Sequence, residues 1–336
     1  MSDFDVAVVG AGAAGMMTAA VAGQRGRRVV LLDHAPRLAE KIRISGGGRC
    51  NFTNRQVGPA NFHSANPHFC RSALARYTSA DFLEMVDRHR IAYHEKHRGQ
   101  LFCDRDSQQI IDMLVAECEV GGVTWQRPCE VHGLESTDEG FSLATSTRSL
   151  KVKTLVIATG GLSIPKIGAT DFGLKVAHRF GIPIIPPRPA LVPLTFDSTH
   201  WRPYAALAGV SLEVEVRCQG GRFVEDLLFT HRGLSGPAIL QISSLWEPGH
   251  PIVINLVPQL ALADALIEHK SGSRQLLGTV VARWLPKRLA DHWVQANGLE
   301  GRPIAEISDR QLRHLAQSLT NWELFPNGPE GYRKAE

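Results

Sequence analysis

Three glycines near the start of the chain have the spacing of a phosphate-binding turn. Gly10, Gly12 and Gly15 lie in the run Gly-Ala-Gly-Ala-Ala-Gly, which follows an apolar stretch at residues 6–9. In this pattern the first glycine permits a tight turn from strand to helix, the second admits a pyrophosphate to the backbone, and the third lets the helix pack against the strand. The free N–H groups at the start of the helix then bind the anion without a lysine.

An acidic residue follows where a ribose contact is expected. Asp33 ends a second apolar run, residues 28–32, about 20 residues beyond the glycines, where a carboxylate accepts hydrogen bonds from a ribose diol. Its charge would repel a 2′-phosphate, so the sequence predicts FAD or NAD in this site rather than NADP.

A second glycine-rich segment covers residues 45–54 and contains three consecutive glycines, Gly46, Gly47 and Gly48. Such a run is costly to order and is typical of backbone that passes very close to a flat or anionic group, although a flexible linker is the alternative. Lys41 and Arg49 carry charges that suit a pyrophosphate. A second glycine-rich loop directly after Asp33, the acid expected to bind the ribose, favours a longer cofactor than NAD, which indicates FAD.

A third glycine pair follows the apolar residues 155–157 in the run Ala158-Thr159-Gly160-Gly161. Ligands of parallel sheets gather at the carboxyl ends of the strands, so this run is a second place where backbone is expected to contact the cofactor. A plain strand-to-loop turn is the alternative.

Two further side chains have types suited to chemistry. His231 lies in a polar, glycine-interrupted segment, residues 228–238, whose composition suits a loop that faces a ligand, and a structural histidine is the alternative. Cys50 has no partner cysteine nearby, which favours a structural role over a redox role. The six cysteines form no C-x-x-C pair, so no metal site is predicted.

Composition indicates an ordinary globular protein. Of 336 residues, 43% are hydrophobic and 21% are charged. The formal charge of +4 does not by itself predict nucleic-acid binding, which would require the cations of residues 25–28 and 41–43 to gather on one exposed face. The uncharged stretch at residues 6–24 has an acidic flank and spaced glycines, so we expect a cytoplasmic protein without a membrane partner.

The elements that must position these residues follow from periodicity. Apolar spacing predicts helices within residues 79–90, 110–118 and 174–180, with Asp106 or Ser107 as the cap of the second. Residues 98–103 are predicted as a short strand or turn, and residues 123–131, 140–144 and 149–152 as a small antiparallel region. After a proline-rich crossing, residues 211–217, 222–230 and 251–257 are predicted as strands and residues 260–319 as several helices, the last with a Ser308/Gln311 capping box.

Several of these segments together resemble one family. Residues 10–15, 44–54, 99–103, 158–161, 189–194 and 230–238 are similar to the BaiN/YhiN-like family of bacterial FAD-dependent oxidoreductases, which includes aminoacetone oxidases. The resemblance implies an α/β fold with a Rossmann-like FAD-binding domain of the two-dinucleotide-binding type, an inserted β-barrel and a small helical subdomain. The corresponding ranges are 1–190, 191–260 and 261–322.

Two departures accompany the resemblance. Asp33 stands where the family commonly has glutamate, a shortening that should keep the ribose contact but shift it. Family members also continue with a glycine-rich segment that returns to the FAD domain. Residues 323–336 are therefore expected to be the start of that return segment, with the remainder missing.

The sequence and the resemblance together give a set of expected contacts. His231 is expected near the substrate. The expected FAD-binding residues are Gly10, Gly12, Ala13, Ala14, Gly15, Asp33, His34, Lys41, Ser45, Gly46, Gly47, Gly48, Arg49, Cys50, Asn51, Val131, Thr159, Gly160 and Gly161.

The predicted function is hydride transfer between flavin N5 and a small organic substrate, with NAD(P)H-dependent reduction of an activated C=C bond favoured. No second G-x-G-x-x-G occurs, so NAD(P)H is expected to dock transiently. Oxidation of an aminoacetone-type amine by dioxygen is an open alternative. So is an RNA-associated or sensing flavoprotein with structural FAD. A small-molecule partner is expected rather than a nucleic acid, and the oligomeric state is open.

Overall fold

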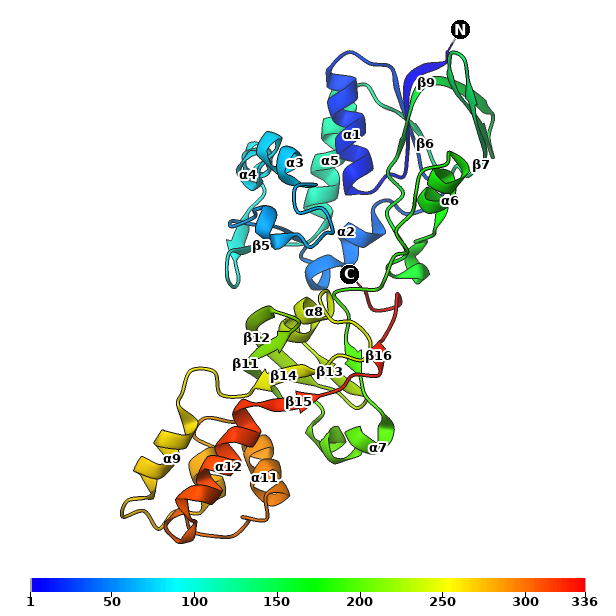
Figure 1. Ribbon diagram of the computed structural model, residues 1–336. Helices are drawn as coiled ribbons and strands as arrows, with labels where there is room; N and C mark the ends of the chain where they lie inside the picture. Colours follow the sequence, from blue (N-terminus) through cyan, green and yellow to red (C-terminus); the bar gives the residue numbers. More distant parts are fainter. Residues whose placement is uncertain (1, 336) are drawn as a thin grey trace. The chain divides into compact units, whose positions relative to one another are not determined.

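The structure is a computed structural model that describes residues 2–335. The chain divides into two compact units, the first ending at Ile185 and the second beginning at Pro186. Figure 1 colours the first unit from blue to green and the second from green to red. No helix among the described residues is long and apolar enough to cross a membrane.

The first unit is built on a six-stranded sheet whose strand order is β6-β2-β1-β9-β8-β7. Strands β6, β2, β1 and β9 run parallel, and β8 and β7 extend the sheet antiparallel. The predicted strand–helix–strand unit is confirmed as β1, α1 and β2. The bounds are β1 (Phe4–Val9), α1 (Ala13–Gln24), β2 (Val29–Leu32), β6 (Thr124–Gln126), β7 (Val131–Thr137), β8 (Gly140–Thr145) and β9 (Ser149–Ile157).

Both faces of this sheet are covered, which explains the near-continuous apolar runs of β1 and β2. Val8 and Leu31 pack into one cluster with α1 and α5 (Gln108–Val120), and Ala7 and Val30 pack into another on the opposite face. A Cβ on Gly23 would clash with the backbone of Gly121, so glycine lets the end of α1 lie against the end of α5. At the other end of α5, Ser107 is the N-cap residue and its side chain forms no cap hydrogen bond, while the carboxylate of Asp106 accepts a hydrogen bond from the Gln108 N–H.

A three-stranded sheet and three further helices also belong to the first unit. The helix predicted within residues 79–90 is confirmed as α4, and residues 98–103 contain a strand, β5. Figure 1 shows α3 and α4 separated from the six-stranded sheet by α1 and α5. The sheet order is β3-β5-β4, and the bounds are β3 (Asn51–Asn54), β4 (Tyr93–Glu95), β5 (Gln100–Cys103), α2 (Glu40–Ile44), α3 (Arg71–Arg76) and α4 (Ser79–Arg88).

Two expectations for this unit are wrong. Residues 123–131 are not an antiparallel strand, because α5 carries the chain back along the sheet and places β6 parallel to β2. Residues 149–152 and 155–157 are not separate elements but one nine-residue strand, β9, which pairs with β8 on one side and β1 on the other. The helix predicted at residues 174–180 is confirmed as α6 (Phe172–Arg179).

The second unit contains a seven-stranded sheet with the order β15-β14-β11-β12-β13-β10-β16, in which all pairs are antiparallel. In its core the rings of Trp201, Phe229 and Trp322 stack with centroids 5.9 to 6.5 Å apart. The bounds of the strands are β10 (Leu194–Thr195), β11 (Ser211–Cys218), β12 (Gly221–Phe229), β13 (Gly233–Ser235), β14 (Ile252–Asn255), β15 (Trp322–Leu324) and β16 (Gly328–Pro329).

The helices expected within residues 260–319 are confirmed, and the Ser308 hydroxyl accepts the Gln311 N–H as the predicted capping box requires. The helices of this unit are α7 (Ser198–Trp201), α8 (Pro237–Ser243), α9 (Leu262–Lys270), α10 (Leu277–Val281), α11 (Lys287–Ala296) and α12 (Asp309–Thr320).

Most of the segment expected as a loop at residues 228–238 is regular structure. Strand β12 continues to Phe229, β13 follows at Gly233, and only residues 230–232 form the turn between them. Gly236 adopts φ +87°, and a Cβ there would lie 2.6 Å from the carbonyl oxygen of Asp226, so glycine lets α8 begin directly beside the hairpin. Near the end of the chain, β15 and β16 also belong to the sheet of the second unit, where they pair with β14 and β10.

Candidate cofactor site

The first unit contains a cavity of about 1150 Å³ at the carboxyl ends of β1, β2 and β9. Drug-sized ligands occupy cavities of about 300–1,000 Å³, so this one has room for a larger molecule. The carboxyl edge of the parallel strands is also where open α/β sheets bind their ligands. The cavity therefore lies where a dinucleotide is expected.

The geometry of the glycine turn at the end of β1 is compatible with the roles expected from its spacing. Gly10 adopts φ +102°, and a Cβ there would lie 2.5 Å from the carbonyl oxygen of Ala158. A Cβ on Gly15 would clash with the carbonyl oxygen of Gly10, so Gly15 serves packing and does not line the cavity. Gly12 lines the cavity, and a Cβ there would meet nothing within 4 Å.

The start of α1 is open to an anion. Gly12 is the N-cap residue and supplies no side-chain acceptor, so the N–H groups of the first turn, which have no partner within the helix, are free to bind a ligand. Ala13 and Ala14, the first residues of α1, also line the cavity. The backbone and the helix dipole there favour a phosphate.

Asp33 is held in a fixed orientation at the end of β2. Its Oδ2 accepts a hydrogen bond from the Ala11 N–H (2.5 Å), and its Oδ1 accepts one from the Ala35 N–H (2.7 Å). The side chain is 14% exposed and lines the cavity. Because each carboxylate oxygen has two lone pairs, one on each remains for a ribose hydroxyl.

The three consecutive glycines form a tight turn that presents its flanking residues to the cavity. Gly46, Gly47 and Gly48 all have positive φ, at +57°, +68° and +88°, which only glycine adopts without strain. Ser45, Cys50 and Asn51 line the cavity, whereas the three glycines and Arg49 are not among the lining residues. Contacts of residues 46–49 with a cofactor stay a prediction.

The loop after β9 offers an unused polar group. Thr159 Oγ1 is buried and has no hydrogen-bond partner among the described residues. Gly160 and Gly161 follow it, and a Cβ on either would meet nothing within 4 Å. A buried orphaned hydroxyl beside open backbone fits a polar ligand that passes close to the chain, as a dinucleotide would.

The other predicted residues divide between the two units. His34, Lys41 and Val131 line the cavity. His231 is exposed on the turn between β12 and β13 in the second unit, and its role near the substrate stays a prediction.

Sequence reasoning missed several residues that line the cavity. Tyr77 and Phe82 come from α4 and the residue pair before it, and no local signal in the sequence indicated their position. The segment from β9 to the start of α6 also lines the cavity, through Ser163, Ile167, Gly168, Ala169, Thr170 and Phe172. The Gly168 turn into α6 was the sequence signal available for this segment.

Two side chains that line the cavity have raised pKa values. Burial raises the pKa of the Cys50 thiol above its usual value, and only Ser45 opposes this by hydrogen bonding. Burial, followed by the charge of Asp81, raises the pKa of the Tyr77 hydroxyl. Both side chains therefore carry their protons at neutral pH.

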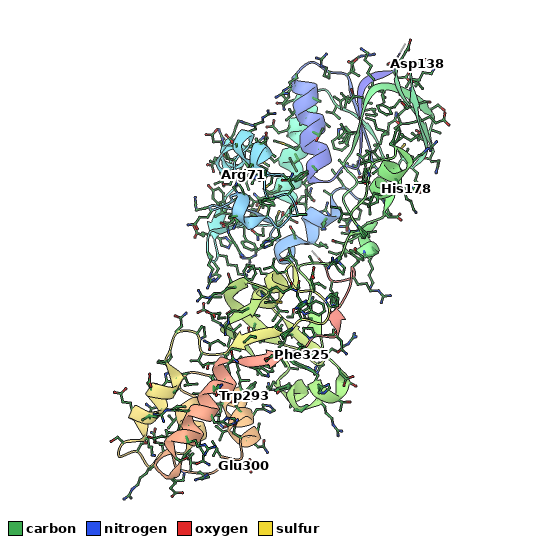
Figure 2. The ribbon with its side chains drawn as sticks, in the orientation of Figure 1. Arg71, Asp138, His178, Trp293, Glu300 and Phe325 are labelled. Carbon is green, nitrogen blue, oxygen red and sulfur yellow. The ribbon has the colours of Figure 1, made fainter. Side chains whose placement is uncertain are left out.

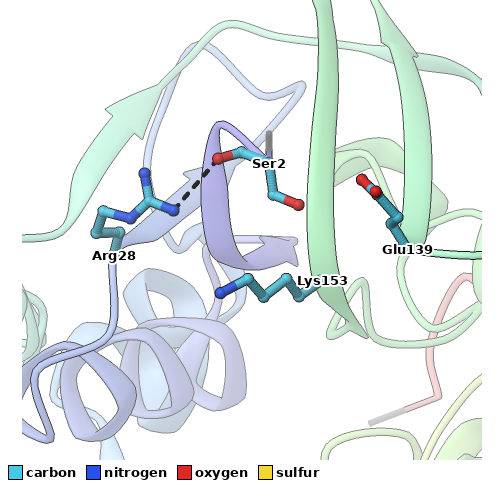
Figure 3. Close-up of a pocket in the computed structure, with 4 residues that line it drawn as sticks. All are labelled: Ser2, Arg28, Glu139 and Lys153. Carbon is cyan, nitrogen blue, oxygen red and sulfur yellow. Dashed lines mark hydrogen bonds between the residues drawn. The ribbon is translucent and has the colours of Figure 1, made fainter.

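A second hollow of about 590 Å³ lies at the opposite, amino edge of the sheet and is lined by Ser2, Arg28, Glu139 and Lys153 (Figure 3). Its cations already have a partner, because Asp5 pairs with Lys153 at 2.9 Å and with Arg28 at 3.4 Å. Hydrogen bonds from Lys153 and Arg28 hold the pKa of Asp5 well below its usual value.

The basic face required for the RNA alternative does not form from the residues proposed for it. Arg25, Arg27 and Arg28 follow the carboxyl end of α1, whereas Lys41 and Arg43 lie beyond the carboxyl end of β2, at the opposite edge of the sheet. Arg43 is also half-buried and donates to the side chain of Gln108. These five residues therefore do not meet the condition that was set for the RNA alternative.

Comparisons with known proteins point to one family. The family model described as HI0933-like protein Rossmann domain matches residues 4–313. A protein of Escherichia coli (strain K12) named ribosomal RNA dihydrouridine synthase is 47% identical over 338 residues, which cover 100% of this chain and 84% of that protein. A Haemophilus influenzae protein of the same name is 44% identical over 335 residues, which cover 98% of this chain and 83% of that protein.

A more distant relative carries a different name. The 3-dehydro-bile acid delta(4,6)-reductase of Clostridium scindens is 27% identical over 247 residues, which cover 71% of this chain and 59% of that protein.

Proposed function

The chain belongs to the HI0933-like Rossmann-domain family, and from that premise we propose that it is an FAD-dependent reductase of an activated carbon–carbon double bond. We further propose that the double bond belongs to a uridine of ribosomal RNA. The observation that carries the proposal is 47% identity along the whole chain to a ribosomal RNA dihydrouridine synthase.

The cavity of the first unit supports FAD as the cofactor. The free first turn of α1 fits a pyrophosphate, Asp33 fits a ribose diol, and the orphaned hydroxyl of Thr159 fits a polar edge of the flavin. When bound, FAD would supply the hydride that saturates the double bond, and NAD(P)H would replenish it.

The names of the relatives support reduction over amine oxidation. Dihydrouridine is uridine whose ring double bond between C5 and C6 is saturated, and a delta(4,6)-reductase is named for positions of unsaturation in a steroid. In both cases a double bond conjugated to a carbonyl gains two hydrogens. This matches the class of reaction favoured by the sequence.

RNA is the proposed substrate in place of the small molecule expected from the sequence. The relatives that match nearly the entire chain are named for ribosomal RNA. A small unsaturated molecule is the second candidate, and the bile-acid reductase favours it at 27% identity over 71% of the chain.

The reaction needs a proton as well as a hydride, because one carbon of the double bond receives each. Among the side chains that line the cavity, Cys50 and Tyr77 have raised pKa values, and we propose that Cys50 donates the proton. The thiol is 5% exposed and follows the glycine turn, so its position is fixed, whereas Tyr77 is 39% exposed. Water then reprotonates the thiolate.

For the second unit, we propose that its seven-stranded sheet and its helices are the β-barrel and helical subdomain that the family resemblance implies. His231, exposed on the β12–β13 turn, is proposed to contact the substrate.

The test starts with the visible spectrum of the purified protein and the identity of any released flavin. The yellow protein is then reduced anaerobically with NADPH and mixed with ribosomal RNA from a strain that lacks the corresponding gene. We expect flavin reoxidation and a uridine whose mass has increased by two hydrogens. Flavin that is reduced by aminoacetone and reoxidised by dioxygen, with unchanged RNA, would overturn the proposal in favour of the amine oxidase.

A further inference from the structure

A long stretch of the first unit lacks negative charge. Residues 41–80 contain no Asp or Glu, although the chain has 33 of these residues in all. The same stretch contains the basic residues Lys41, Arg43, Arg49, Arg55, His63, His68, Arg71 and Arg76. A run of one sign is the electrostatic footprint of an anionic partner.

The middle of this stretch, residues 55–77, is a surface segment. It runs from the end of β3 through α3 to the start of α4, and none of its residues is buried. Phe69 is 80% exposed and Phe62 is 49% exposed. Large exposed rings beside unpaired cations mark a surface that binds something.

The cations of the segment are available. The side chains of Arg71 and Arg76 form no ion pair or hydrogen bond within residues 2–335, whereas Arg55 pairs with Glu95 at 2.9 Å. Figure 2 shows Arg71 on α3, and Arg76 ends the same helix. Two free guanidinium groups thus lie on one short helix that directly follows Phe69.

The segment is flanked by residues of the cofactor cavity. Asn51 and Phe52 line the cavity just before it, and Tyr77 lines the cavity at its end. A polymer held on the segment therefore lies beside the cavity of the same unit. An enzyme that acts on a base in RNA must take that base out of its stack, which favours binding next to unpaired nucleotides.

We propose that residues 55–77 are the docking surface for unpaired RNA next to the target uridine. Phe62 and Phe69 stack on bases, and Arg71 and Arg76 contact phosphates. This inference rests on the proposed function, since it names how the RNA substrate is held. Aromatic stacking with cations along the backbone is how proteins bind single strands without reading sequence.

An anionic membrane is the competing partner for basic and aromatic residues. An interfacial helix binds a membrane surface through one continuous apolar face. Here Phe62 and Phe69 lie outside α3, which has only six residues and carries arginines at both ends. The arrangement favours separate rings that stack on separate bases.

The test uses the full-length protein with bound FAD and a fluorescent, unstructured uridine-containing RNA. Phe69→Ala should weaken RNA binding by about 5- to 150-fold, which is the range for one stacking ring, and Phe69→Tyr should restore it. The double variant Arg71→Ala/Arg76→Ala should lower the slope of log Kd against log salt concentration by about 1.4, since each single-strand phosphate contact contributes about 0.7. Val120→Ala and Arg179→Ala, at exposed sites outside the segment, are the matched controls.

The outcomes separate the two proposals. All variants should keep the flavin spectrum of the parent, because Phe69, Arg71 and Arg76 do not line the cavity. If the parent reduces uridine in RNA and the variants bind and reduce it equally well, this docking surface is wrong and the proposed function stands. If the parent neither binds nor reduces RNA, the proposed function has failed. Tighter binding to phosphatidylserine vesicles than to RNA, lost in the same variants, overturns the inference in favour of a membrane.

Discussion

The carboxylate of Asp33 accepts a hydrogen bond from the backbone N–H of Ala11, which ties the end of β2 to the glycine turn at the end of β1. The acid that is expected to bind ribose thus also fixes the turn that is expected to bind pyrophosphate. Its second bond, from the Ala35 N–H, fixes the chain on the other side. One side chain therefore organises the cavity before any ligand is present.

Replacement of Asp33 should weaken both the fold and the cofactor site. Asp33→Ala removes two hydrogen bonds to a charged acceptor, and we expect a loss of about 3 to 6 kcal/mol in the free energy of unfolding. The measurement is urea unfolding of the flavin-free protein, followed by FAD titration. Asp33→Glu should keep FAD binding, and Asp138→Ala, exposed on the turn between β7 and β8, should change neither property. Unchanged stability in Asp33→Ala would contradict the bridging role.

Two glycines of the same turn should respond differently to the same substitution. Gly15→Ala introduces a methyl group against the Gly10 carbonyl and should destabilise the protein by about 1 to 3 kcal/mol or more. Gly12→Ala meets no protein atom within 4 Å, so the flavin-free protein should unfold within about 1 kcal/mol of the parent. Its FAD affinity should nevertheless fall by about tenfold or more, because the methyl group occupies the approach of the pyrophosphate. Equal FAD affinity in Gly12→Ala and the parent would show that the cofactor does not bind against this turn.

A buried carboxylate at the junction of three helices should set the acid stability of the first unit. Burial alone would raise the pKa of Glu117, but hydrogen bonds from His89, Gln24 and Arg88 lower it to about 2. The folded-state pKa lies below the unfolded value, so the stabilisation is complete above about pH 4.5 and is lost as the pH falls through about 2. The shift corresponds to about 3 kcal/mol.

The measurement is urea unfolding of Glu117→Gln between pH 7 and pH 3. We expect this variant to be less stable at pH 7 and to lose less stability than the parent on acidification. Glu119→Gln, two residues along α5 and exposed, is the matched control. Parallel pH profiles for Glu117→Gln and the parent would show that the network does not carry the acid dependence.

Local signals located the cofactor cavity well. The glycine turn, Asp33 and the Thr159 loop each lie at the end of an apolar strand, and parallel pairing brings such ends to one edge. The position of Tyr77 was not predictable, because it depends on how α4 packs against α5 rather than on neighbouring residues. The parallel pairing of β6 was missed for the same reason, since it depends on the crossover through α5.

Around His231, local sequence signals predicted a loop where the structure has paired strands. Polar residues and glycines at residues 230–236 suggested irregular structure, but Gly233 lies where any Cβ would clash with the β10 backbone, so the glycine permits strand pairing. A glycine required by a close approach and a glycine required by a loop look alike in sequence. Only the partner strand distinguishes them.

The final prediction concerns the proton. If Cys50 donates it, Cys50→Ala should slow flavin reoxidation by RNA about 10²- to 10⁴-fold, the usual contribution of a general acid, while reduction of the flavin by NADPH is unchanged. Tyr77→Phe should retain most of the rate. Because burial raises the pKa of the thiol, the rate should stay level through the range where an exposed thiol ionises and fall only above it.

Cys50→Ser provides the control for packing, since it keeps the size of the side chain and supplies a weaker acid. Its rate should lie between those of Cys50→Ala and the parent, with the same flavin content in all three proteins. A rate that falls in Tyr77→Phe and not in Cys50→Ala would assign the proton to the tyrosine hydroxyl, whose pKa is also raised by burial. Such a result would leave Cys50 as a packing residue between the glycine turn and β3, where its buried side chain lies.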